Sequence, residues 1–128
     1  MTHGTAVIGA TGYATDIVVG GHHRLTADEP VAGGGTDAGP APYDLLVASL
    51  GACTAITLRM YADRKGWPLA SLTVDLRIVR GSEGMRIERT LAIDGLDADH
   101  KARLAEIAEK TPVTLTLKGG IPIHTTLA

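Results

Sequence analysis

The sequence predicts a single domain of the α+β class, because three kinds of segment follow one another along its 128 residues. Apolar and polar residues alternate at 71–80 and 84–94, which is typical of strands, since successive side chains point to opposite faces. An uncharged apolar run at 45–58 is typical of a buried helix. A stretch rich in Gly, Pro and Asp, residues 28–42, precedes that helix and is expected to be a loop.

The residues before this loop are expected to form two or three strands. Residues 5–10 and 13–28 have strand-like composition, and the pairs Thr11-Gly12 and Gly20-Gly21 are typical of turns between strands.

The central helix is predicted to run from Pro42 to about Arg64 and to stop at Gly66. Because its middle is apolar around the whole circumference, it must be covered on all sides, which a domain of this size cannot do with its own elements. We therefore expect an obligate homodimer with this helix near the two-fold axis.

The second half is predicted to hold a hairpin and a second helix. The Gly81–Gly84 link joins the two alternating segments, and Asp97 or Asp99 is the expected N-cap of an amphipathic helix that ends at Lys110-Thr111. By propensity alone, residues 113–117 and 121–128 are predicted to be strands.

Composition excludes several classes of function. A net charge of −2, no basic block and few aromatic residues argue against nucleic-acid binding. The longest uncharged run is too short to span a bilayer, and no signal peptide is evident, so we expect neither membrane insertion nor export. A single cysteine excludes an internal disulfide and fits the reducing cytoplasm. We expect no metal and no cofactor.

Cys53 is the first candidate for chemistry, and two interpretations stay open. Free cysteine is often a small buried core residue, and here it follows Gly51 and Ala52. As a nucleophile it would need a nearby Arg or His to favour its thiolate, because it lies about three turns into the helix, beyond the reach of the helix dipole.

Two arginines are candidate catalytic partners of that thiol. An unbroken strand would point Arg89 at the core, where a thiolate or the Asp44 carboxylate could balance its charge. A bulge would instead turn Arg89 to water, the commoner outcome. Arg24 is the second candidate, on a strand that leads into the glycine-rich loop.

The five histidines leave a rival chemistry open. His22, His23 or His124 could serve as general base to Cys53 in a hydrolase, although their spacing does not demand it. No third ligand is spaced to complete a His22–His23 metal site. The glycine-rich loop lacks the Lys-Ser/Thr of a phosphate-binding loop and is interpreted as a turn.

Residues 28–69 resemble the signature of the OsmC/Ohr family of organic hydroperoxide resistance proteins, and the OsmC-like branch most closely. The matching positions are the loop glycines, Gly39-Pro40, Asp44-Leu45-Leu46, Gly51-Ala52-Cys53-Thr54 and Met60-Tyr61-Ala62. The resemblance implies an intertwined homodimer in which curved antiparallel sheets wrap around two central helices. It also implies a short helical turn from Pro112 to Leu115, against the propensity-based strand.

The activity that the resemblance implies is reduction of organic hydroperoxides, an antioxidant role in the oxidative stress response. Cys53 would attack the peroxide and become a sulfenic acid. The family's second cysteine, which would resolve it, is replaced by Thr111. The hydroperoxidase branch has a glutamate ten residues before the nucleophile, where this chain has Tyr43, the residue usual in the OsmC-like branch. Thr111 and Tyr43 are therefore taken as candidate substrate-binding residues.

Two functions follow as expectations. The first is a one-cysteine peroxidase in which an external thiol resolves the sulfenic acid. The second is a module without redox activity that binds a small apolar ligand at the dimer interface, with Cys53 merely lining the cavity.

Overall fold

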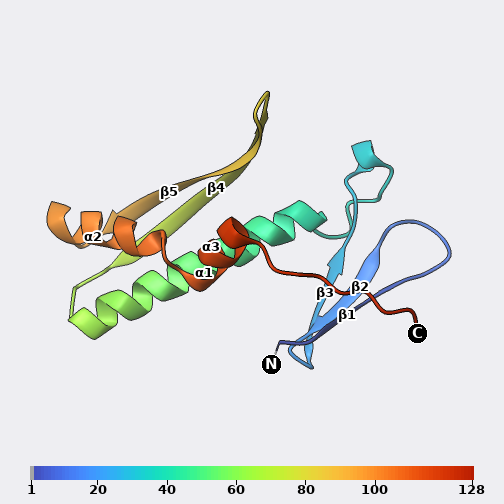
Figure 1. Ribbon diagram of the computed structural model, residues 1–128, viewed down its shortest axis with the longest axis horizontal. Helices are drawn as coiled ribbons and strands as arrows, with labels where there is room; N and C mark the ends of the chain where they lie inside the picture. Colours follow the sequence, from blue (N-terminus) through green and yellow to red (C-terminus); the bar gives the residue numbers. More distant parts are fainter. Residues whose placement is uncertain (1) are drawn as a thin grey trace. The chain divides into compact units, whose positions relative to one another are not determined.

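An antiparallel sheet of three strands begins the chain, in the order β1-β2-β3 (Figure 1). The computed structural model describes residues 2–128, and these strands span Gly4–Ile8 (β1), Thr15–Val19 (β2) and His23–Ala27 (β3). Gly20 and Gly21, both with positive φ, form the turn between β2 and β3, because glycine adopts that conformation without steric cost. The expected strands and turns are confirmed.

The loop after β3 is organised around the buried carboxylate of Asp28, which is 3% exposed. Its Oδ2 accepts hydrogen bonds from the Thr36 amide (3.1 Å), the Thr36 hydroxyl (2.8 Å) and the Ala38 amide (3.1 Å), and its Oδ1 accepts from the Glu29 amide (2.8 Å). The loop also contains a short 3-10 turn, Val31–Gly33 (η1). A buried carboxylate with so many donors holds an otherwise irregular segment in one shape.

Gly39 is required in this loop by close approach of two backbone segments. A Cβ added there would lie 1.9 Å from the Thr26 carbonyl oxygen, closer than any side chain permits. The loop is thus packed directly against the end of β3, which explains one glycine of the glycine-rich stretch without invoking a phosphate ligand.

Asp28 should make stability acid-sensitive. The Ala38 amide, the Thr36 hydroxyl and the other donors lower the pKa of this carboxyl below its ordinary value of 3.8. Because the folded pKa is the lower one, the stabilisation is present above the unfolded pKa and is lost as pH falls through the folded pKa. Denaturant melts of Asp28→Asn should show a stability deficit at neutral pH that shrinks in acid.

The exposed carboxylate of Asp16 provides the control for this measurement. Asp16→Asn should show no such deficit at neutral pH. A deficit of Asp28→Asn that stays constant down to strongly acidic pH would contradict the assignment.

The chain divides into two compact units, Met1–Leu46 and Val47–Ala128, and most of helix α1 (Pro42–Lys65) belongs to the second. The predicted helix is confirmed, and Gly66 with positive φ follows its end. Its buried side chains recur every fourth residue: Leu50, Thr54, Leu58 and Ala62. The fully buried side chains of this apolar helix therefore form one stripe.

The predicted hairpin is confirmed as β4 (Ser71–Gly81) and β5 (Gly84–Asp94), paired without a break from Ser71 opposite Asp94 to Gly81 opposite Gly84. Its inner face packs against the helices of the second unit. The core formed there consists of Leu58, Ala62, Leu69, Ile93, Leu104 and Ala108.

Helix α2 (Ala98–Ala108) follows the hairpin, with Asp97 as its N-cap: the Asp97 side chain accepts the His100 amide. Helix α3 (Pro112–Gly119) comes next, so the propensity-based strand at 113–117 is wrong and the resemblance predicted the conformation correctly. Thr111 precedes Pro112 in extended conformation and Pro112 has a suitable φ for a first helical position, which together start the helix.

The predicted last strand, residues 121–128, is also wrong: these residues have no regular structure. Residues with high strand propensity do not form a strand unless a neighbouring strand pairs with their backbone N–H and C=O groups. Within the described chain, no strand pairs with this segment.

Helix α1 presents a second apolar stripe to solvent, formed by Ala48, Ala52, Ile56 and Met60, on the side opposite the buried one. Ile56 and Met60 are 54% and 56% exposed. At 24 residues, α1 is long and apolar enough to cross a membrane by length and composition alone, a test that core helices of soluble proteins also pass. The uncharged run at 45–58 is shorter than this helix, which is why its length alone predicted no bilayer span.

Candidate functional site

Cys53 lies in the middle of α1, half-buried, and its sulfur faces the start of α3. The Val113 amide donates a hydrogen bond to Cys53 Sγ at 3.5 Å, and the Thr57 hydroxyl lies 4.0 Å from the same sulfur. Val113 is the second residue of α3, where a backbone N–H has no partner within the helix. The sulfur thus receives a donor that the helix leaves free.

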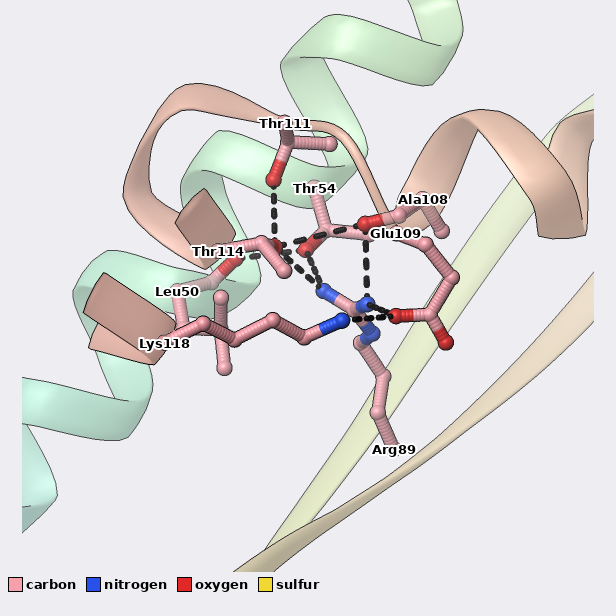
Figure 2. A network of polar contacts seen from close by, with 8 residues as sticks. All are labelled: Leu50, Thr54, Arg89, Ala108, Glu109, Thr111, Thr114 and Lys118. Carbon is pink, nitrogen blue, oxygen red and sulfur yellow. Dashed lines mark hydrogen bonds and ion pairs between the residues drawn. The ribbon is translucent and has the colours of Figure 1, made fainter. Parts of the chain in front are cut away.

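Arg89 points into the core, as its register in the strand predicted, and the alternative of a bulge is wrong (Figure 2). Its Nη1 donates to the hydroxyls of Thr54 (3.0 Å) and Thr114 (2.9 Å), and its Nη2 donates to the Ala108 carbonyl (2.8 Å). The side chain is 13% exposed. These hydrogen bonds end on oxygens, so the structure does not bring the guanidinium into a hydrogen bond with the Cys53 sulfur.

The counter-charge of Arg89 is Glu109, 3.6 Å from Nη2, rather than Asp44 or a thiolate. Asp44 instead accepts the Ala41 amide (3.0 Å) at the start of α1. Lys118 Nζ donates to Glu109 Oε2 at 2.9 Å. That hydrogen bond and the charges of Lys118 and Arg89 lower the pKa of the Glu109 carboxyl below its ordinary value.

Thr111 is fully buried. Its hydroxyl forms a hydrogen bond of 2.6 Å with that of Thr114, which also lies 3.3 Å from the Ala108 carbonyl. Thr111 therefore belongs to the polar network around Arg89 (Figure 2). It is closed off from solvent, which argues against the expected contact with substrate.

The other predicted site residues lie on exposed parts of the chain. Arg24 is exposed on β3 and Tyr43 is about half exposed at the start of α1, both in the first unit. The rings of His22 and His23 lie 4.0 Å apart, rather than on opposite faces, because His22 belongs to the turn before β3. His124 lies in the exposed C-terminal segment.

Among the described residues, no three His, Cys, Asp or Glu side chains are grouped as metal ligands would be. The arrangement around Cys53 is one of thiol, amide and hydroxyl groups.

A cavity of about 540 Å³ opens beside Arg89, within the second unit. Its lining combines apolar and charged side chains: Leu50, Met85, Ile87, Arg89, Glu109, Thr114, Leu117 and Lys118. A cavity of this size can hold a small organic molecule.

Sequence reasoning missed Glu109, Lys118 and the Val113 amide. Glu109 is the residue that follows α2 and Lys118 lies on α3, and neither spacing nor charge pattern joins them to Arg89, a strand residue 20 and 29 positions earlier. Thr54 carried a signal that was overlooked: a polar residue in a stripe that is otherwise apolar, between Leu50 and Leu58, needs a buried partner.

Comparison with known families gives one match. The family model described as OsmC-like protein matches residues 34–126, which include Cys53, Arg89 and Thr111. Among curated proteins there is no significant match.

Solved structures with the same fold come from several bacteria. An OsmC-like protein from Mycoplasma pneumoniae is 21% identical, with a TM-score of 0.79 over 94% of this chain and 89% of that one. An organic hydroperoxide resistance protein OsmC from Legionella pneumophila is 23% identical (TM-score 0.66; 93% and 90% covered). The organic hydroperoxide resistance protein OhrB of Bacillus subtilis is 22% identical (TM-score 0.63; 94% and 92% covered). At these identities the likeness establishes the fold.

Proposed function

Because the chain belongs to the OsmC-like protein family, we propose that it reduces organic hydroperoxides through Cys53 as a single-cysteine peroxidase. The observation that carries the proposal is the contact between the Cys53 sulfur and the Val113 amide at the start of α3. A donated hydrogen bond favours an anionic acceptor, and the thiolate is the reactive form of cysteine. The names of two structural neighbours, organic hydroperoxide resistance proteins, support the same substrate class.

The reaction needs two half-cycles. The Cys53 thiolate attacks one peroxide oxygen, the O–O bond breaks, and the leaving alkoxide takes a proton to become an alcohol, which leaves Cys53 as a sulfenic acid. An external thiol then displaces water to form a mixed disulfide, and a second thiol releases Cys53 and departs as the external disulfide. The reductant must be external, because the chain has one cysteine and Thr111 cannot replace the second.

A reaction in a single turnover tests this function. The reduced protein should consume about one equivalent of cumene hydroperoxide, following the stoichiometry of sulfenic acid formation. Mass spectrometry after dimedone trapping should place the modification on Cys53, and added dithiothreitol should restore the free thiol. No consumption above that of buffer would contradict the proposal.

The expected homodimer fits the apolar surface of α1. The stripe formed by Ala48, Ala52, Ile56 and Met60 lies beside an open, largely apolar depression of about 470 Å³ at Leu69–Leu72. A second copy of this chain, covering that stripe, would remove the apolar surface from water at about 25 cal/mol per Å². We place the dimer in the cytoplasm, where a lone cysteine stays reduced.

The cavity beside Arg89 favours a second candidate function, binding of a small ligand without redox turnover. Its wall of Leu50, Met85, Ile87 and Leu117 suits an apolar molecule. A small molecule retained in native mass spectra, together with a Cys53 that neither reacts with hydroperoxide nor is alkylated while the protein is folded, would favour this candidate over the peroxidase.

A further inference from the structure

We infer that Arg89 is a positioning residue, which holds the Val113 amide at the Cys53 sulfur without touching the sulfur itself. The inference rests on the proposed role of Cys53 and adds to it the means by which the donor is kept in place. It assigns to Arg89 a role through geometry rather than through its charge.

Arg89 joins the two helices that carry the sulfur and its donor. The same nitrogen, Nη1, donates to Thr54 at 3.0 Å and to Thr114 at 2.9 Å. Thr54 is the neighbour of Cys53 on α1, and Thr114 is the neighbour of Val113 on α3. One planar group therefore sets the spacing between the backbone segments that bear sulfur and amide.

The hydroxyl of Thr54 is oriented for this role. It donates its own proton to the Leu50 carbonyl at 2.7 Å, which leaves its oxygen lone pairs to accept from Arg89. The buried hydroxyl of Thr114 has a comparable arrangement, with the Ala108 carbonyl and the Thr111 hydroxyl as its further partners. Each hydroxyl is thus held in one orientation by its other hydrogen bonds, with an oxygen lone pair facing Arg89 Nη1.

The second nitrogen of the guanidinium fixes a third segment. Nη2 donates to the Ala108 carbonyl at the end of α2 and lies 3.6 Å from Glu109, which also accepts from Lys118 on α3. A lysine at this position would keep the positive charge but lack the planar fork that reaches three segments at once.

The position of α3 matters because the Val113 N–H has no hydrogen-bond partner within its helix. Only the placement of α3 against α1 keeps this donor 3.5 Å from the sulfur. Thr111, through its hydrogen bond with Thr114, is part of the same support. Thr111, which the family resemblance aligns with a second cysteine, thus helps to hold the Val113 amide at the sulfur of Cys53.

The test is the pH profile of Cys53 alkylation by iodoacetamide in the folded protein. Thr114→Val removes one hydroxyl of the network and leaves every charge in place. Its profile should shift to higher pH, by up to about one unit if the loosened α3 no longer brings the Val113 amide within hydrogen-bond distance of the thiolate. Thr116→Val, the same change at an exposed position of α3, is the matched control and should follow the parent.

Substitutions of Arg89 separate geometry from charge. Arg89→Met should shift the profile in the same direction as Thr114→Val, and Arg89→Lys should stay shifted although it keeps the charge. A parental profile for Arg89→Lys would overturn the inference, because charge alone would then suffice. A parental profile for Thr114→Val would overturn it as well, even if Arg89→Met fails to fold.

The readout is independent of peroxidase turnover, since alkylation needs no hydroperoxide. If the variants shift the profile but the parent consumes no cumene hydroperoxide, the proposed function fails and the positioning role stands. If the parent consumes hydroperoxide and the profiles of all variants coincide, the function stands and the positioning role fails.

Discussion

Replacing Cys53 with serine should abolish hydroperoxide consumption and leave the chain folded. A serine hydroxyl is un-ionised at neutral pH and cannot form a sulfenic acid, so the first half-cycle has no substitute nucleophile. The change is nearly isosteric and the position is only half-buried, which limits any effect on packing. The rate of cumene hydroperoxide loss, measured with excess dithiothreitol, should fall to that of buffer.

A serine introduced at the exposed Ala102 of α2 is the matched control and should keep the parental rate. Circular dichroism and the urea midpoint establish whether Cys53→Ser is folded. A folded Cys53→Ser variant that still consumes hydroperoxide would exclude Cys53 as the nucleophile and, with it, the proposed mechanism.

Replacing Ile56 with glutamate should convert the proposed dimer to monomer. Ile56 is 54% exposed in the middle of the apolar stripe of α1, so a single chain tolerates a carboxylate there. At a dimer interface the same carboxylate would be buried without a partner, at a cost of about 3–5 kcal/mol for each of the two chains, so Kd should rise by roughly a thousandfold or more. Sedimentation equilibrium gives the mass in solution of the parent and of the variant, and so distinguishes dimer from monomer for each.

Lys101→Glu, which introduces the same side chain at an exposed position of α2, is the control and should remain dimeric. A parent protein that sediments as a monomer would refute the dimer itself. A dimeric Ile56→Glu variant would instead place the interface elsewhere.

The elements of the fold could largely be predicted from the sequence, because their signals are local. The alternation of apolar and polar residues predicted both strands of the hairpin, and Pro42 and Gly66 predicted the two ends of α1. Prediction failed at residues 113–117, where the branched and apolar residues of a strand stand in a helix. There the helix start formed by Thr111 and Pro112 outweighs the strand propensity of the side chains that follow.

The candidate site was predictable only in part. The register of β5 pointed Arg89 inward, and that geometry is confirmed, but its partners come from three other segments of the chain. Nothing local in the sequence brings Glu109 or Thr114 to it. The Val113 amide was beyond prediction for a different reason: a backbone donor has no residue type that marks it.

The topology of the strands has a consequence for how the chain reaches its native state. Within each unit, every strand of the described chain pairs only with its neighbour in sequence, as β1 with β2, β2 with β3 and β4 with β5. Such short-range pairings close small loops and form early, because little chain entropy is lost before contacts are gained. Folding of each hairpin should therefore be unimolecular and fast. For the proposed dimer, the slow step should be the encounter of two chains, whose rate rises with concentration.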